Sequence, residues 1–161
     1  MFQNRGLAPR RIANQEVAKL SYLEHRIEAM VGLSLTNIPE GIRYTKDHEW
    51  AKPEGKRVRV GITDHAQTEL TDVVYVELPP VGKVVKQGEP IGTVESVKAV
   101  SEIFAPVSGK VVEVNKSLGD QPELVNKDPY GSGWMAILEV SNPADLNALL
   151  DAAAYRRLIG E

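Results

Sequence analysis

The sequence predicts a mainly β domain, a sandwich or a barrel, and three features of the chain support this fold class. Valine and isoleucine dominate residues 38–140 in short runs, and glycine and proline separate these runs. Residues 58–62 alternate between valine or isoleucine and other residues, as a β-strand does. Many short strands with regularly spaced turn signals are typical of a sandwich or barrel.

The predicted elements follow in order along the chain. Residues 14–31 carry apolar side chains at helical spacing, which predicts an amphipathic helix in an N-terminal extension, 1–37, outside the core. A short helix is expected at 64–70, with Thr63 or Asp64 placed to cap it. Strands are expected at 58–62, 73–78, 84–85, 91–94, 111–114 and 134–140.

A single helix is expected near the C-terminal end, from about 143 to 159, with Pro143 in its first turn and Asn142 or Ser141 as its cap. The β core and this helix together are expected to form one carrier domain, 38–161. An apolar stripe on the helix should pack on the β core, and its members are Leu146, Leu149, Leu150 and Ala153.

The β region contains a short internal repeat. Gly-Lys-Val-Val at 82–85 returns at 109–112. Each copy predicts a strand, a small turn with glycine and an acidic residue, and a second strand. Units of so few strands cannot bury their apolar faces alone, so the two halves are expected to pack together.

Composition excludes several classes of function. The 161 residues include no cysteine, which excludes disulfides, thiolate zinc sites, cysteine-ligated iron–sulfur clusters and cysteine nucleophiles. A net charge of −3 and a pI of about 5.7 disfavour a broad nucleic-acid-binding surface. No apolar run approaches the ~20 residues that span a bilayer. We therefore expect neither a nucleic-acid nor a membrane partner.

The N-terminal segment leaves the cellular location open to two interpretations. Arg5, Arg10 and Arg11 precede the first acidic residue, Glu16, and an arginine-rich, acid-poor start is one mark of a transit peptide. Later glutamates weaken that pattern, so a cytoplasmic location is expected, or a mitochondrial one if the segment is a transit peptide. Met30 offers an alternative translation start, so that residues 1–29 can also be an upstream extension.

Residues 94–106, between the two repeat copies, predict a hairpin with a tight turn at 97–99 and Lys98 at its tip. Exposed lysines are common and need no function. A lysine on a rigid, protruding hairpin is nevertheless what a modifying ligase requires, because the amine is accessible and the backbone has one shape. The modified side chain would then be a long tether that visits several partners.

These residues resemble the lipoyl-attachment hairpin of the glycine cleavage system H-protein family. The resemblance begins with Glu-Ser-Val-Lys-Ala at 95–99 and Ala-Pro-Val-Ser-Gly at 105–109. It covers roughly residues 38–158, and several motifs in the family's order make it specific. The further motifs are YTKDHEW at 44–50, GITDHAQ at 61–67, DVVYVELP at 72–79, DPYGSGW at 128–134 and LLDAAAY at 149–155.

The resemblance implies a barrel-sandwich hybrid of the lipoyl/biotinyl type with (R)-lipoate in amide linkage on Lys98. It implies a carrier and not an enzyme. The carrier would take the aminomethyl group of glycine from the P protein, glycine decarboxylase, to the T protein, aminomethyltransferase. It would pass electrons to the L protein, dihydrolipoyl dehydrogenase. A lipoate ligase or a lipoyl/octanoyl transferase is a further expected partner, and a monomer is the expected state.

The resemblance also implies roles for individual residues. Glu95 and Gly109, three before and eleven after Lys98, match positions associated with lipoylation recognition. Gly109 also has an explanation from backbone geometry, because glycine tolerates a positive φ in a turn. Glu49 is the first candidate partner of the cationic amine on a loaded arm, and Glu102 is the second.

The neighbours of Glu49 complete the predicted site. Asp47 is a further arm contact, at a position where relatives often have serine, and Val100 stands where many have threonine. The chain has only three histidines and no clustered acids. We therefore interpret His48 and His65 as structural or surface residues, and we expect no catalytic and no metal-binding residues.

Other classes of protein fit the hairpin less well. In biotinyl carriers methionines flank the lysine, and lipoyl domains of 2-oxoacid dehydrogenase complexes usually carry aspartate before it, whereas Val97 and Ala99 flank Lys98. An enzyme with a Schiff-base lysine needs burial or a nearby cation, and Glu95 and Glu102 provide the opposite. An unmodified interaction module and an H-like protein devoted to lipoate relay remain as alternatives.

Overall fold

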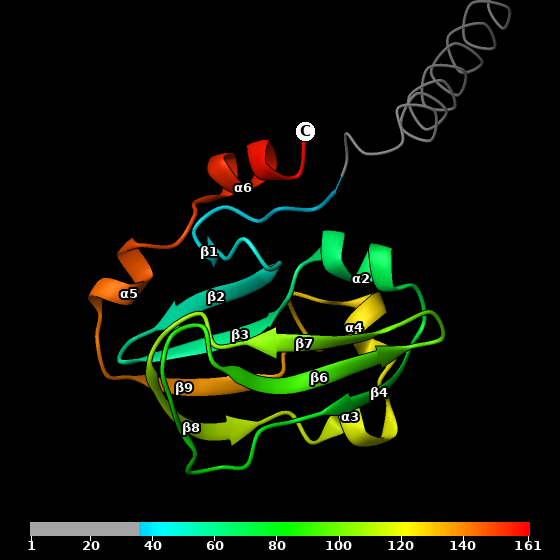
Figure 1. Cartoon of the computed structure of the whole chain (residues 1–161), viewed down its shortest axis with the longest axis horizontal. Helices are drawn as coiled ribbons and strands as arrows, with labels where there is room; N and C mark the ends of the chain where they lie inside the picture. The colour runs from blue at the N-terminus through cyan, green and yellow to red at the C-terminus, as the bar shows by residue number, and fades with distance from the viewer. Residues whose placement is uncertain (1–35) are drawn as a thin grey trace, which may run out of the picture. The chain divides into compact units, whose positions relative to one another are not determined.

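The structure is a computed structural model that describes residues 36–161. The helix expected at 14–31 lies outside the described residues, as does most of the N-terminal extension. The described part contains nine strands, β1 to β9, and five short helices, α2 to α6 (Figure 1). None of these helices combines the length and the apolar character that a membrane crossing requires.

The strands form two antiparallel sheets, one with six strands in the order β1-β2-β3-β9-β8-β5 and one with three in the order β4-β6-β7. The strands are β1 Arg43–Tyr44, β2 Glu49–Glu54, β3 Arg57–Ile62, β4 Val73–Glu77, β5 Val84–Val85, β6 Pro90–Ser96, β7 Val100–Phe104, β8 Gly109–Val114 and β9 Ala136–Val140. The helices are α2 Asp64–Leu70, α3 Ser117–Asp120, α4 Leu124–Lys127, α5 Ala144–Asn147 and α6 Ala152–Leu158.

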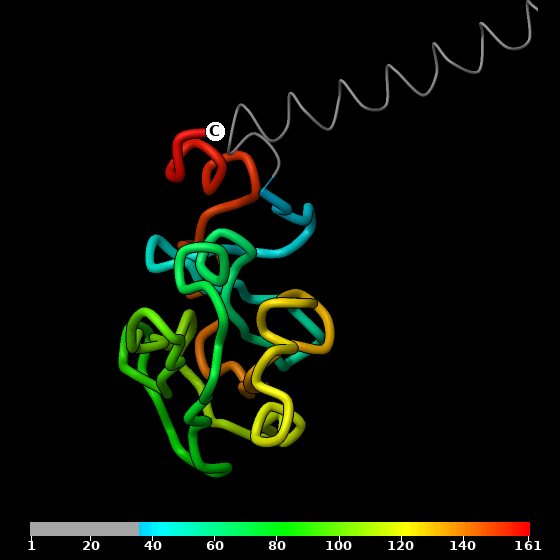
Figure 2. Tube along the Cα trace, turned by 90° about the vertical axis from the view of Figure 1, so that its right-hand side faces the viewer, coloured from blue at the N-terminus to red at the C-terminus, as the bar shows by residue number. Residues whose placement is uncertain are grey.

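Both sheets contribute to one hydrophobic core. Val60 of β3, Leu138 of β9 and Val94 of β6 are all completely buried in it. In the view of Figure 2, the hairpin of β6 and β7 lies on one side of the molecule, and α3 and α4 lie on the opposite side. The prediction of a mainly β fold is therefore confirmed as two antiparallel sheets with short helices.

Helix α2 lies between β3 of the first sheet and β4 of the second along the chain, as the sequence predicts for residues 64–70. Thr63 is its N-cap, and the Thr63 Oγ1 accepts a hydrogen bond from the Ala66 N–H at 3.1 Å. A cap of this kind satisfies an N–H that the first helical turn leaves unpaired. The predicted short strands are also present, with bounds that differ by a few residues.

Two expectations are wrong. The single C-terminal helix is two helices, α5 and α6, because Leu150 between them exchanges backbone hydrogen bonds with Tyr44, at 2.8 and 2.9 Å. Asp151 then caps α6 by accepting from the Ala154 N–H at 2.8 Å. The second repeat copy does not continue into a second strand, because α3 and α4 follow β8 and bury Leu118 and Val125 in the core.

A second cluster of buried aromatic residues holds the C-terminal segment against the first two strands. The rings of Tyr44 and Tyr155 stack with their centroids 4.7 Å apart. The Trp50 indole N–H donates to the carbonyl of Pro129 at 3.0 Å. These contacts fix α6 beside β1, so that the Tyr155 hydroxyl reaches the end of the fold where Thr63 and His48 lie.

Candidate functional site

The predicted hairpin forms from β6 and β7, and exposed Lys98 lies in the turn between them. Ser96 is largely buried and fixes the shape of this turn. Its backbone N–H donates to the Ala99 carbonyl at 2.8 Å. Its Oγ accepts from the N–H groups of Lys98 and Ala99 at 3.1 and 3.0 Å. The backbone at Lys98 therefore has a defined conformation although its side chain is exposed.

A second set of hydrogen bonds holds the tip from outside the hairpin. The Val97 N–H donates to the carbonyl of Asp72, just before β4, at 3.0 Å. Asn126 of α4 binds both neighbours of Asp72. Its Nδ2 donates to the Thr71 carbonyl at 2.7 Å, and its Oδ1 accepts from the Val73 N–H at 2.9 Å. The hairpin tip is thus fixed relative to α2 and α4.

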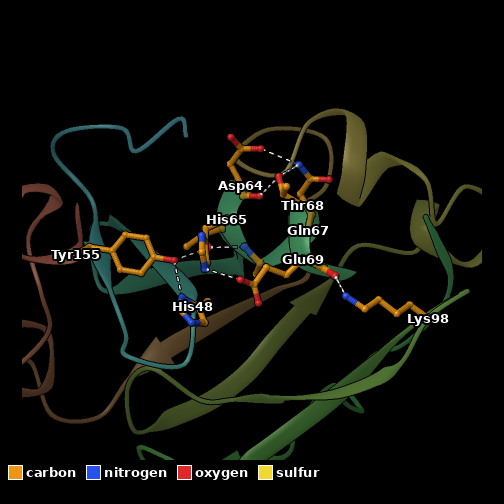
Figure 3. Close-up of polar contacts among 10 residues, drawn as sticks. His48, Asp64, His65, Gln67, Thr68, Glu69, Lys98 and Tyr155 are labelled. Carbon is orange, nitrogen blue, oxygen red and sulfur yellow. Dashed lines mark hydrogen bonds and ion pairs between the residues drawn. The ribbon is translucent and has the colours of Figure 1, made fainter. Parts of the chain in front are cut away.

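A cleft of about 340 Å³, which we call the lysine cleft, opens beside the tip. It lies between α2 and the residues that follow Lys98, and the Lys98 Nζ donates to the Glu69 carbonyl of α2 at 3.4 Å (Figure 3). Its lining residues are Asp47, His48, Ile62, Ala66, Glu69, Leu70, Lys98, Ala99, Val100, Ser101 and Ile103. Apolar side chains and polar or charged ones therefore share the lining of the cleft.

His48 and His65 lie in a polar network at one side of α2. The Tyr155 hydroxyl lies 2.7 Å from the His48 Nδ1 (Figure 3). It also lies 2.8 Å from the Thr63 Oγ1. The His65 Nε2 lies 3.3 Å from a Glu69 carboxylate oxygen, and the two imidazole rings are 4.8 Å apart. Burial, followed by the neighbouring His65, lowers the pKa of His48.

Glu49 is only 1% exposed. Its Oε1 accepts from the Thr45 hydroxyl at 2.8 Å, whereas its Oε2 is buried and has no hydrogen-bond partner within residues 36–161. Burial is the largest of the causes that raise the pKa of Glu49 to about 7, and Asp47 raises it further, whereas the Thr45 hydroxyl and the nearby backbone of Phe104 lower it. Such an unpaired buried oxygen is costly, and it leaves a position for a hydrogen-bond donor or a cation.

Glu49 lines a second cavity of about 360 Å³, which we call the carboxylate pocket. Its lining residues are Tyr44, Thr45, Lys46, Asp47, Glu49, Gln87, Gly88, Phe104, Ala105, Pro106, Ala148, Leu149, Leu150 and Leu158. Asp47 is exposed and lines both the lysine cleft and the carboxylate pocket. Asp47 therefore borders both the cleft that Lys98 lines and the pocket that the buried Glu49 lines.

Glu102 lines neither the lysine cleft nor the carboxylate pocket. The structural reason for glycine at position 109 also differs from the expected one. Exposed Glu102 lines a different hollow with Glu77 and Lys83. Gly109 does not have a positive φ. It is needed because a Cβ there would lie 2.2 Å from the Glu139 carbonyl oxygen on β9. Glycine is thus required at position 109 by the close approach of β8 and β9, and not by a turn with positive φ.

Sequence reasoning missed three residues of the site. Ser96 carried a usable signal, since serine in a predicted turn commonly bonds the backbone two or three residues further on. No local sequence signal indicated Asn126 or Tyr155, because their hydrogen-bond partners lie 53 to 107 residues away along the chain. His48, interpreted from the sequence as a structural or surface residue, lines the lysine cleft.

This geometry defines a class of protein: a β carrier domain that presents a lysine on a fixed hairpin beside a cleft. The family model described as "Glycine cleavage H-protein" matches residues 42–161. A glycine cleavage system H protein of Anaeromyxobacter sp. (strain K) is 61% identical over 77% of this chain and 97% of its own length. One from Halalkalibacterium halodurans is 53% identical over 79% of this chain and 99% of its own length.

A solved structure agrees with the sequence comparisons. The crystal structure of a glycine cleavage system H protein from Mycobacterium marinum is 43% identical and has a TM-score of 0.71. The alignment covers 77% of this chain and the whole of the Mycobacterium marinum chain. The chain therefore belongs to the glycine cleavage H-protein family, and its function is that of the lipoyl carrier of the glycine cleavage system. It is a carrier and not itself a catalyst.

Proposed function

We propose that Lys98 carries the lipoyl group in amide linkage. In this proposal the chain takes the aminomethyl group of glycine from the P protein to the T protein and passes electrons to the L protein. The observation that carries the proposal is the position of Lys98, the exposed tip of a hairpin that Ser96 and Asp72 hold in one shape beside a cleft. The lipoyl group supplies the dithiolane sulfur that a cysteine-free chain lacks.

The residues around Lys98 fit a lipoyl arm. Ile62, Leu70 and Ile103 line the lysine cleft and offer an apolar surface to an aliphatic chain. The Glu69 carbonyl lies within hydrogen-bond reach of the Lys98 Nζ, which keeps one N–H when it becomes an amide nitrogen. These residues would therefore orient the arm along the cleft and reduce its exposure to water.

Glu49 is the group we propose to hold the charged end of the loaded arm. Its Oε2 is buried and has no hydrogen-bond partner in the described part of the chain, so an ammonium group beside it would supply a donor. A cation there also favours the ionised carboxylate and lowers its pKa. Asp47, which lines both cavities, adds a second negative charge on the path from Lys98. A contact between Glu102 and the loaded arm is supported only by the family resemblance, since Glu102 lines a different hollow.

Glu95 and Gly109 have different parts in our proposal for lipoylation. Glu95 is exposed on β6 three residues before Lys98, where a lipoate ligase or a lipoyl/octanoyl transferase can contact it. Gly109 is buried against the Glu139 carbonyl and would act through the fold. A monomer that docks transiently on each enzyme suits this function, and the barrel-sandwich hybrid is the architecture we propose for the domain.

A lysine-to-arginine pair of variants tests the proposal. Lys98→Arg should abolish glycine decarboxylation by the P protein, because arginine cannot form the lipoyl amide. Lys110→Arg, at an exposed position on β8, should retain the activity of the unchanged chain. Both should unfold within about 0.5 kcal/mol of the unchanged chain, as exposed substitutions usually do. Retained activity in Lys98→Arg, or failure of that variant alone to fold, would contradict the proposal.

A further inference from the structure

We infer that Tyr155 holds His48 in the tautomer protonated on Nε2, and that this N–H is a hydrogen-bond donor that the lysine cleft presents to the sulfur end of the lipoyl arm. The inference rests on the proposed function, since it requires a lipoyl arm on Lys98. It gives His48 a contact with the cofactor arm, and it makes Tyr155 a positioning residue that acts through His48.

One direction of the hydrogen bonds around Tyr155 gives every hydroxyl proton among these side chains an acceptor. Thr63 is completely buried, and its Oγ1 already accepts from the Ala66 N–H. The Tyr155 oxygen is the acceptor within residues 36–161 that the Thr63 hydroxyl proton can reach, at 2.8 Å. The Tyr155 proton is then left for the His48 Nδ1, at 2.7 Å.

The opposite direction would require the His48 Nδ1 to donate to Tyr155, and Tyr155 to donate to Thr63. The buried Thr63 hydroxyl proton would then have no acceptor, which carries a free-energy cost. An imidazole whose Nδ1 accepts a hydrogen bond, and which is neutral, carries its proton on Nε2. Burial and His65 both lower the pKa of His48, which favours that neutral form.

The Nε2 of His48 is available to a ligand. His48 lines the lysine cleft together with Lys98, and Nε2 has no hydrogen-bond partner within residues 36–161. The backbone of His48 has a φ of +70°, in the left-handed region that residues other than glycine seldom adopt. Hydrogen bonds from the His48 N–H to the Thr45 carbonyl and from the Thr63 N–H to the His48 carbonyl hold it there.

The position of His48 in the lysine cleft indicates which part of the lipoyl arm it would contact, namely the sulfur end. Lys98 is held by the Glu69 carbonyl at one side of the lysine cleft. Asp47, next to His48, borders the carboxylate pocket where Glu49 lies. Lys98 and His48 line the same cleft, and an arm laid along it from Lys98 toward Glu49 would bring its sulfur atoms to His48. A fixed N–H donor there would hold the arm in the cleft and keep the sulfur atoms from water.

The tautomer can be measured on the unmodified full chain, independently of lipoylation. Long-range ¹H–¹⁵N NMR correlations of the imidazole should show His48 protonated on Nε2. In Tyr155→Phe the signals should move toward a mixture of tautomers. Tyr130→Phe is the matched control, because it removes a partly exposed tyrosine hydroxyl that bonds Asp64 and Asn37 but not His48. A proton on Nδ1, or an unchanged tautomer in Tyr155→Phe, would overturn the inference.

The second measurement is the lifetime of the loaded arm on the lipoylated chain. His48→Phe and Tyr155→Phe should each shorten it about fivefold to tenfold, the loss expected for one hydrogen bond. His48→Gln keeps an N–H donor and should restore the lifetime to within about twofold. An unchanged lifetime in both phenylalanine variants, with a shortened one in Glu49→Gln, would overturn the inference and leave the proposed function standing. Absence of lipoyl on Lys98 would overturn the proposed function instead.

Discussion

At the scale of single residues, Glu49 connects the site with the stability of the fold. Burial raises its pKa from 4.5 to about 7. Between these two pH values the unfolded chain has released the proton that the folded chain still holds. Raising the pH through this window therefore favours unfolding, whereas below about pH 4.5 both states are protonated and the cost is absent.

Glu49→Gln should remove this pH dependence. At pH 8 the variant should have a free energy of unfolding higher than that of the unchanged chain by about 2 to 3 kcal/mol, because glutamine has no charge to bury. Urea unfolding at pH 4 and at pH 8 measures the effect, and the pH 4 result is the internal control, since the two proteins should agree there. A variant that is less stable at both pH values would show that the carboxyl group stabilises the fold.

Gly109 provides a second test at this scale. Gly109→Ala should lower the free energy of unfolding by about 2 to 3 kcal/mol, because its Cβ would overlap the Glu139 carbonyl oxygen. Gly119→Ala in α3 is the matched control, because its Cβ would meet no atom within 4 Å, and it should be neutral or slightly stabilising. If urea unfolding found Gly109→Ala as stable as Gly119→Ala, a direct role in ligase recognition would replace the structural one.

At the scale of elements, the turn between β6 and β7 links the local sequence to function. Ser96→Ala removes the Oγ that accepts from the Lys98 and Ala99 N–H groups. We expect global stability to fall by about 1 kcal/mol, the net value of a hydrogen bond. The kcat/KM of the lipoylating enzyme should fall about tenfold, because the tip loses its fixed shape.

Ser132→Ala, at an exposed position far along the chain, is the control for Ser96→Ala and should be lipoylated at the unchanged rate. Steady-state lipoylation and urea unfolding together separate the two effects. An unchanged kcat/KM in Ser96→Ala would show that the ligase does not require the preformed turn.

The sequence predicts elements well where local interactions determine them. The strand at β3 follows from alternating valines, and α2 follows from the Thr63 cap and the residues after it. The break between α5 and α6 could not be predicted in this way. It depends on the pairing of Leu150 with Tyr44, which lies more than 100 residues earlier, and this pairing ends a helical pattern that Leu146 and Leu149 suggest.

The candidate site divides in the same way. Lys98 and its hairpin can be predicted because both strands and the turn lie in one continuous segment. The place of the buried Glu49 beside a pocket cannot be predicted, since Phe104 and Leu150, which line that pocket, lie far from it along the chain. The polar network of Tyr155 and His48 likewise exists only after α6 has packed beside β1.

At the scale of the whole molecule, the fold places Lys98 both at an exposed hairpin tip and at the side of a cleft. The hairpin of β6 and β7 exposes Lys98 at its tip, and α2, which connects the sheets along the chain, forms a side of the lysine cleft. A carrier needs both, because its cofactor must reach several enzymes and must be sheltered between them. In our proposal, the buried carboxyl of Glu49 and the Nε2 of His48 hold the arm in its sheltered position.

The most direct test of this account is the mass of the protein isolated from its own cells. The chain should carry one added group of roughly 190 Da, the size of a lipoyl amide, and peptide mapping should place it on Lys98. Lys110, exposed on β8, should be unmodified in the same sample. An unmodified chain from cells with active lipoylation, or a lipoyl group on another lysine, would contradict the account.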